Sequence, residues 1–249
     1  GAAFMADVYG RLTGHAGVCL STLGPGATNL VTGVADADSD GAPLIALTGQ
    51  VSTNKMHITA HQFLDLVQLF EPITKRSKQI VEPASVNEII RLAFKYAESE
   101  KPGACHIDLP VNIAKLPVEE SEKPLIRRQL PVELPSENAI KVAVDTINKA
   151  KRPVILAGNG AVRAHAEKAL TLFSNLLKIP VINTMMAKGI VPCDNAYSLL
   201  TIGTPQKDYV NKYIESADVV ITVGYDIIEY SPDKWNYQNK ASIVHIDAR

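Results

Sequence analysis

Short runs of apolar residues alternate along the chain with stretches in which apolar residues recur every three or four positions. In the first half, the runs are Val18–Leu20, Leu44–Leu47 and Ala104–Ile107, each next to a Gly or Pro, as is typical of buried strands. Residues 27–38 and 86–98 have the spacing of amphipathic helices. Strands alternating with helices predict an α/β domain built on a parallel sheet.

The second half repeats this alternation. The expected elements are a helix over 137–150, a strand over 153–158, a helix over 164–177, a strand over 181–183, a helix over 208–216 and strands over 219–223 and 243–246. We therefore predict an α/β fold of two doubly wound parallel-sheet domains, the second of them Rossmann-like.

A proline-rich stretch separates the two halves. The segment "KLPVEESEKPLIRRQLPVELPSE" has four prolines, mixed charges and no clear periodicity, which favours an extended path over a helix or a central strand. We predict a first domain over residues 1–115, a linker over 116–136 and a second domain over 137–249. The chain stops at "VHIDAR", directly after a strand, so we expect the second domain to be truncated at its end.

Composition narrows the class of protein. The 249 residues carry a net charge of −1 with dispersed basic residues, which argues against a nucleic-acid partner. No apolar run approaches the roughly 18 residues of a membrane span. Cys19, Cys105 and Cys193 lie far apart without CxxC spacing. We expect all three to be buried in a reducing compartment, which favours a cytoplasmic protein.

The turn in "STLGPGATNL", residues 21–30, is the first candidate site. Glycine at the carboxyl end of a parallel strand lets a ligand approach the backbone, and a helix opened by Thr28 and Asn29 would offer free amides. No GK[ST] follows, so this is not a Walker loop. The proline removes one amide donor, which suits contact with a flat ring better than contact with phosphate. On these residues alone, a plain turn without a ligand remains equally open.

The other motifs are best explained without a bound ligand or metal ion. "LAGNGAV" has Arg163 where a dinucleotide fingerprint needs Gly or Ala, so a plain turn is preferred over an NAD site. His57 and His61 are four apart but lack a third ligand, and no metal site is predicted. Residues 36, 38 and 40 are aspartates that we interpret as a solvated helix end, not a calcium loop. His106 lies in a strand and is expected to be packed or hydrogen-bonded.

Several ordered motifs together resemble a known family. They are "GAAFMADVYGRLTG", "STLGPGATNLVTGVADADSDGAPLIALTGQV", "AHQFLD", "PITKRS" and "PGACHIDLP" in the first half, and "PVILAGNGAV", "ADVVITVGYD" and "VHID" in the second. The first set resembles the pyrimidine-binding domain of thiamine diphosphate enzymes of the acetolactate synthase group. The second set is similar to the central domain of the same family. The resemblance runs through essentially the whole chain.

The resemblance implies a site and a reaction. Gly24, Pro25, Gly26 and Asn29 match the turn that packs near thiamine diphosphate in a cleft between two subunits, so a homodimer or homotetramer is implied. Gln62 matches a glutamine that points toward the active site, with His61 beside it, and both are expected catalytic residues. Two pyruvates would give 2-acetolactate and carbon dioxide, with thiamine as the electron sink and Mg²⁺ in the complete enzyme.

Two family elements are missing from this sequence. The glutamate that activates the cofactor would stand about two residues before Gly1, and the metal-binding GDG motif of the diphosphate domain does not occur. The resemblance therefore implies a fragment that has no turnover by itself. The run "VGYDIIEYSPDKWN" resembles the catabolic branch of the family, which works without FAD, so FAD is disfavoured.

Alternatives remain open at this point. Another thiamine diphosphate decarboxylase or carboligase would share the fold and the turn. A non-catalytic nucleotide-binding module would instead use residues 137–249. A structural interaction protein would associate through exposed apolar faces.

Overall fold

The computed structural model describes residues 1–58, 60–118, 134–203, 209–238 and 240–248. The chain divides into two units, residues 1–130 and 131–249, which we call the first domain and the central domain. Most of the predicted linker, residues 119–133, lies outside the described residues. The domain limits predicted from the sequence therefore stay a prediction.

The first domain is built on a parallel sheet with the strand order β1-β2-β4-β3. Its strands are β1 (Gly17–Ser21), β2 (Leu44–Gln50), β3 (Arg76–Gln79) and β4 (Ala104–Pro110). Its helices are α1 (Ala2–Thr13), α2 (Pro25–Thr28), α3 (Val31–Ser39), α4 (Leu66–Phe70) and α5 (Val86–Glu98). Short 3₁₀ turns are η1 (Thr53–Lys55), η2 (Glu71–Ile73), η3 (Pro83–Ser85) and η4 (Ile113–Lys115).

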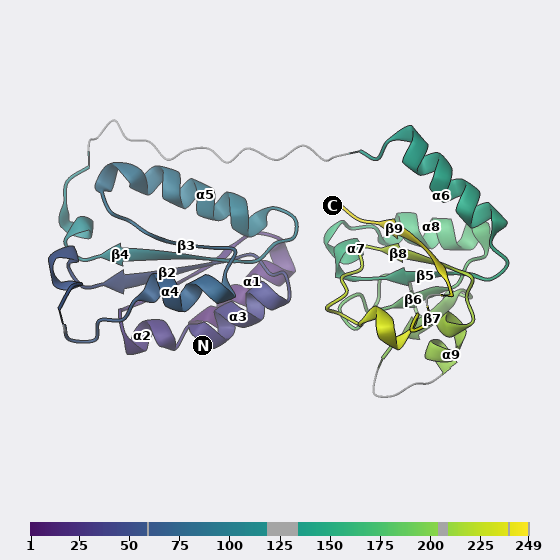
Figure 1. The fold of residues 1–249 in the computed structure, drawn as a ribbon, viewed down its shortest axis with the longest axis horizontal. Coiled ribbons are helices and arrows are strands. Elements are labelled where there is room, and N and C mark those ends of the chain that lie inside the picture. Colours follow the sequence, from purple (N-terminus) through teal and green to yellow (C-terminus); the bar gives the residue numbers. More distant parts are fainter. Residues whose placement is uncertain (59, 119–133, 204–208, 239, 249) are drawn as a thin grey trace. The chain divides into compact units, whose positions relative to one another are not determined.

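Helices cover both faces of this sheet (Figure 1). One core joins α1, α3 and α4 to the sheet and contains Val34, Leu44 and Phe70. The other core packs α5 on the opposite face through Ala93 and Ala97, against Ile107. The predicted doubly wound arrangement is confirmed for this domain.

An arginine ties α1 to the end of α3. The Arg11 guanidinium contacts Asp7 at 2.9 Å within α1, Asp36 at 3.1 Å and Asp40 at 2.5 Å. The Asp38 carboxylate accepts a hydrogen bond from the amide of Ala104 at 3.0 Å. These aspartates lie at the end of α3 with partly exposed side chains, as expected, and their carboxylates also bind Arg11 and the amide of Ala104.

The central domain has a five-stranded parallel sheet with the order β7-β6-β5-β8-β9. The strands are β5 (Pro153–Ala157), β6 (Val181–Asn183), β7 (Ser198–Thr201), β8 (Val219–Val223) and β9 (Ser242–Ile246). The other elements are α6 (Glu137–Lys149), α7 (Asn159–Arg163), α8 (Glu167–Leu177), α9 (Tyr209–Glu215) and the 3₁₀ turn η5 (Pro232–Lys234). The chain order reverses between β5 and β8, the position where Rossmann-like sheets bind their ligands.

Two cores again flank the sheet. Helices α6, α7 and α8 pack on one face, around Ile155, Leu170 and Ile221. Helix α9 packs on the other face through Val210 and Ile214 (Figure 1). Each domain thus has its own hydrophobic core on both faces of its own sheet.

Three local predictions differ from the structure. The helix expected over 27–38 is divided into α2 and α3. The helix expected over 164–177 begins at Glu167, because residues 164–166, with His165 among them, form a turn that separates it from α7. Cys19 and Cys105 are buried as predicted, but Cys193 is exposed.

None of the helices in the described ranges has both the length and the apolar character that crossing a bilayer requires.

Candidate functional site

The Gly-Pro-Gly turn connects β1 directly to a short helix. Gly24 has φ 56° and ψ −121°, a conformation that is open to glycine and strongly unfavourable for other residues. Helix α2 begins at Pro25, where a missing amide costs nothing. The amide of Thr28 donates to Gly24 O at 3.0 Å and that of Asn29 to Pro25 O at 3.2 Å. These two amides are therefore not free for a ligand, contrary to expectation.

The segment around Gln62, which is distant in sequence, packs on this turn. A Cβ atom at Gly24 would lie 2.7 Å from the carbonyl oxygen of Gln62 and 2.8 Å from its Cβ. Gln62 itself has φ 59° and is exposed. A non-glycine residue held at positive φ costs free energy and is frequent at functional sites. The structure therefore brings together two of the residues expected in the site, over a separation in sequence that no local pattern reveals.

A cavity lies beside the turn, at the carboxyl ends of the strands. Its volume is about 370 Å³, within the range of small-molecule sites. It is lined by residues from the ends of β1, β2 and β4 and the segment after β1: Leu20, Ser21, Thr22, Leu47, Thr48, Gly49 and Leu109. The edge where parallel strands end is the usual place for a ligand in an α/β sheet.

The remaining expected residues lie around this region with different exposure. Pro25 is exposed at the start of α2, and Gly26 is half-buried, with a would-be Cβ 2.6 Å from Thr22 Cγ2. Asn29 is exposed at the end of α2. His61 is exposed and lies in the same turn as Gln62. The catalytic and binding roles of these residues stay predictions.

Buried polar side chains underlie the same ends of β2 and β4. The hydroxyl of Thr48 donates to Asp108 Oδ1 at 2.9 Å and lies 2.9 Å from His106 Nε2. Ser77 Oγ lies 2.8 Å from His106 Nδ1. The ring of His106 also stacks on Phe70, with the ring centroids 4.2 Å apart. The predicted packed and hydrogen-bonded role of His106 is confirmed.

The pKa values of His106 and Asp108 are shifted because both side chains are buried. Burial lowers the pKa of His106 to about 3, so the ring is neutral at neutral pH. Since Thr48 donates to Asp108, it can only accept from His106, which places the imidazole proton on Nε2 and makes Ser77 the donor to Nδ1. Burial also raises the pKa of Asp108, against the opposing effect of its hydrogen bonds. The sequence predictions missed Asp108, although a carboxylate near the end of a buried strand was a signal for it.

In the central domain, the turn after β5 binds the side chain of Glu229. Glu229 accepts hydrogen bonds from the amide of Asn159 at 3.0 and 3.2 Å, from the amide of Asp226 at 3.2 Å and from the hydroxyl of Thr184. A Cβ atom at Gly158 would lie 2.8 Å from Glu229 Oε1. The partial GxG motif therefore forms a strand-to-helix turn that is filled by a side chain.

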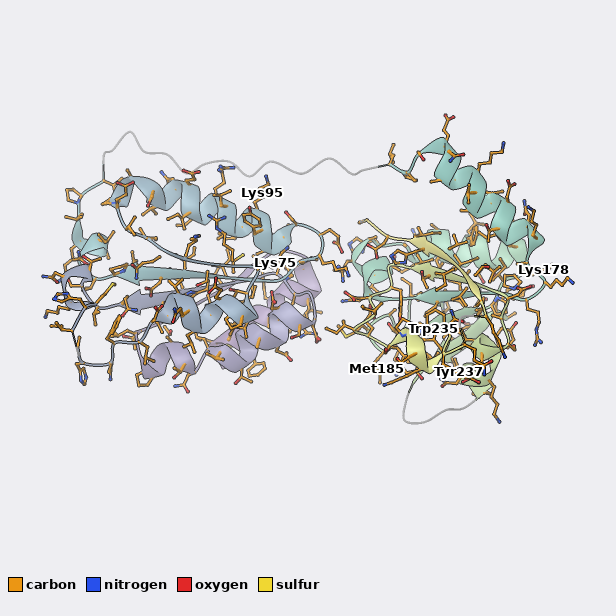
Figure 2. The ribbon with its side chains drawn as sticks, in the orientation of Figure 1. Lys75, Lys95, Lys178, Met185, Trp235 and Tyr237 are labelled. Atoms are coloured by element: carbon orange, nitrogen blue, oxygen red, sulfur yellow. The ribbon has the colours of Figure 1, made fainter. Side chains whose placement is uncertain are left out.

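The segment 224–236 packs tightly over this turn. Trp235 is buried and donates from Nε1 to the hydroxyl of Tyr225 at 3.2 Å. The two rings meet edge to face, with centroids 6.0 Å apart. The hydroxyl of Tyr230 accepts a hydrogen bond from Asn211 at 2.7 Å. Figure 2 shows Trp235 among the side chains of the central domain, with Tyr237 nearby.

Comparison with known families agrees with the two domains. Residues 1–70 match the model described as the thiamine pyrophosphate enzyme, N-terminal TPP binding domain. Residues 140–249 match the model described as the thiamine pyrophosphate enzyme, central domain.

Comparison with curated proteins finds similar chains of greater length. The chain is 39% identical over 255 residues to a protein of Methanocaldococcus jannaschii named probable acetolactate synthase large subunit, and 38% identical over 252 residues to one of Methanococcus aeolicus with the same name. It is 36% identical over 249 residues to the acetolactate synthase of Bacillus subtilis. Each alignment covers 99% of this chain but only 42 or 43% of the relative, so the chain spans about two fifths of the length of these relatives. From the fold and these matches, the chain belongs to the thiamine pyrophosphate enzyme family, of which it carries the N-terminal and central domains.

Proposed function

We propose that the protein condenses two molecules of pyruvate into 2-acetolactate, with loss of carbon dioxide and with thiamine diphosphate as cofactor. The contact between Gly24 and Gln62, beside the cavity at the strand ends, is the observation that carries this proposal. The names of the relatives support the choice of reaction. In this proposal Mg²⁺ accompanies the cofactor and is held outside the residues described above.

The residues of the chain have positioning roles in this reaction. The cofactor, when bound, supplies an electron sink for decarboxylation of a 2-oxo acid. The turn at Gly24 and Pro25 offers a stiff backbone surface with few free amides, which suits contact with a flat ring. The exposed amide of Gln62 can donate to, or accept from, a polar group in the site. The neighbouring His61 is proposed to contribute to the same site.

Replacing Gln62 with asparagine tests the role of this residue. Asparagine tolerates positive φ and keeps the amide, but its side chain is one methylene shorter. We expect kcat/KM for acetolactate formation to fall about 10- to 100-fold without loss of stability, because a displacement of about 1 Å has effects of this size. The assay uses the polypeptide encoded by the complete reading frame, with pyruvate, thiamine diphosphate and Mg²⁺. His57→Ala, an exposed change in the same region, is the control and should leave the rate unchanged.

The product identifies the reaction class. Acetolactate from the unaltered protein supports the proposal, whereas acetaldehyde would show a simple decarboxylase. Absence of any product from pyruvate in the presence of both cofactors would refute the proposed function.

We also propose that the central domain binds no flavin. A dinucleotide places its diphosphate on the first strand-to-helix turn of a Rossmann-like sheet. Here Glu229 accepts from the amide of Asn159 at that turn, and a Cβ at Gly158 would lie 2.5 Å from Gly224 O. A carboxylate and close backbone packing thus stand where the diphosphate would bind, so the residues present do not fit FAD.

The flavin proposal predicts a simple spectrum. The purified protein should lack the visible absorbance bands of flavin, even after incubation with excess FAD. Glu229→Ala should lower the free energy of unfolding by about 1 to 3 kcal/mol, because the Asn159 amide and the Thr184 hydroxyl lose their acceptor. That variant should still bind no FAD, because the glycine backbones remain in contact. Stoichiometric flavin in the unaltered protein would contradict the proposal.

Pairing with a second copy belongs to the same proposal. Helix α1 and strand β1 present apolar side chains to solvent, with Met5 70%, Leu12 81% and Leu20 68% exposed. Apolar surface of this kind is typical of an interaction face. A homodimer or homotetramer in the cytoplasm is the assembly that we infer.

A further inference from the structure

A glutamine connects the buried polar group of the first domain to the segment that carries Gln62. Gln50 is the last residue of β2 and is 2% exposed. Its side-chain Nε2 donates to Leu64 O at 2.9 Å and lies 3.5 Å from Asp108 Oδ2. Its Oε1 accepts from the amide of Val51 at 2.9 Å. Both protons on Nε2 and one lone pair of Oε1 therefore have hydrogen-bonding partners.

The other end of this connection is a fixed carboxylate. Asp108 is fully buried, and its Oδ2 also accepts from Gln79 Nε2 at 2.7 Å, while Oδ1 accepts from Thr48. Three donors, from the two strands that flank β4, thus converge on one carboxylate. Asp108 is thus held on both of its oxygens, and Gln50, at 3.5 Å, makes the longest of the three contacts to it.

The segment that carries Gln62, residues 60–65, has little regular backbone hydrogen bonding. Residues 60–65 contain no helix or strand. Within them, the amide of Phe63 donates to Ala60 O at 3.2 Å. Asp65 begins α4 by accepting from the amide of Gln68 at 3.0 Å. The positive φ of Gln62 needs support from its surroundings, and the bond from Gln50 to Leu64 lies two residues away.

We propose that Asp108 and Gln50 are positioning residues that hold residues 60–65, and with them Gln62, against the turn at Gly24. The importance of this position for catalysis rests on the proposed function. The anchoring itself is a property of the first domain and can be measured without substrate.

Amide hydrogen exchange of the 249-residue chain tests the anchoring. Gln50→Met keeps the length of the side chain but removes the donors to Leu64 and Asp108. Asp108→Asn replaces an acceptor by a donor that faces other donors. Both variants should exchange about tenfold or more faster at residues 60–65, with Phe63 as the reporter and the amides of β2 and β4 as the reference. If Asp108→Asn does not fold, Gln50→Met alone decides.

Ser77→Ala is the matched control. It removes the donor to His106 Nδ1 at the far end of the group and leaves every contact of Gln50 in place. This variant should lose stability but keep the exchange of residues 60–65 within about twofold of the unaltered chain. Unchanged exchange in Gln50→Met, or equal acceleration in Ser77→Ala, would overturn the inference.

Activity assays separate this inference from the proposed function. With the complete reading frame, Gln50→Met and Gln62→Asn should lower kcat/KM non-additively, because both act through the placement of one side chain. If the unaltered protein forms no acetolactate while Gln50→Met still loosens residues 60–65, the proposed function fails and the anchoring holds. If acetolactate forms and the exchange does not change, the anchoring fails alone.

Discussion

Gly224→Ala is expected to unfold the central domain or leave it barely stable. A Cβ atom at this position would lie 2.0 Å from the amide nitrogen of Ala161 and 2.4 Å from Gly160 C, and the φ of Gly224 is 55°. Positive φ costs about 1 to 2 kcal/mol for a residue with a Cβ, and overpacking against backbone adds about 1 to 3 kcal/mol. Together these give a loss of about 2 to 5 kcal/mol, which is a large part of the stability of a domain.

The measurement uses the one tryptophan of the chain. Trp235 is buried in the central domain, so its fluorescence during urea denaturation reports on that domain. Gly189→Ala is the control, since its φ is 91° but nothing lies within 4 Å of the added Cβ. Gly189→Ala should lower the free energy of unfolding only by the cost of positive φ, about 1 to 2 kcal/mol. Equal losses in the two variants would show that close backbone packing is not the cause.

Gly24→Ala is expected to have the largest effect on activity. The added Cβ would push on the backbone and Cβ of Gln62, and the ψ of −121° makes this conformation nearly exclusive to glycine. Acetolactate formation should fall at least about 100-fold, since small displacements in a site have effects of this size. Steady-state kinetics of the complete reading frame measures the rate, and denaturation followed by circular dichroism measures stability.

The control for Gly24→Ala is another glycine with positive φ, which lies outside the site and has a ψ of 4° instead of −121°. Gly14 ends α1 with φ 69°, and nothing lies within 4 Å of a Cβ at that position. Gly14→Ala should lower the stability of the first domain by about 1 to 2 kcal/mol and leave kcat/KM unchanged. A rate loss of the same size in both variants would indicate general damage to the domain.

Strands and helices with strong hydrophobic patterns could be predicted from the sequence. Helix α5 begins and ends where its periodicity indicated, at Val86 and Glu98, and β8 matches its apolar run over 219–223. Strand β3 has the polar sequence Arg-Ser-Lys-Gln and was missed. It lies at the edge of the sheet, where one neighbour suffices and an apolar run is not required.

The candidate site was predictable only in part. The turn at Gly24 is a local feature, because glycine and proline report on backbone geometry directly. Its contact with Gln62 depends on how a distant segment folds back, and the positive φ of Gln62 has no sequence signal. The link from Gln50 to Leu64 joins a side chain to a backbone carbonyl, which residue types do not encode. Tertiary structure was needed for both.

The hydrogen bonds from Ser77 to Asp108 all run in one sense. Ser77 donates to His106, the ring donates to Thr48, and Thr48 donates to the carboxylate. Sending a proton back along this row would require each hydroxyl to rotate and the imidazole to change tautomer in a closely packed interior. The row therefore has a direction: a proton passes along it only from Ser77 toward Asp108, and a second transfer in the same sense first requires the two hydroxyls and the imidazole to return to their starting arrangement.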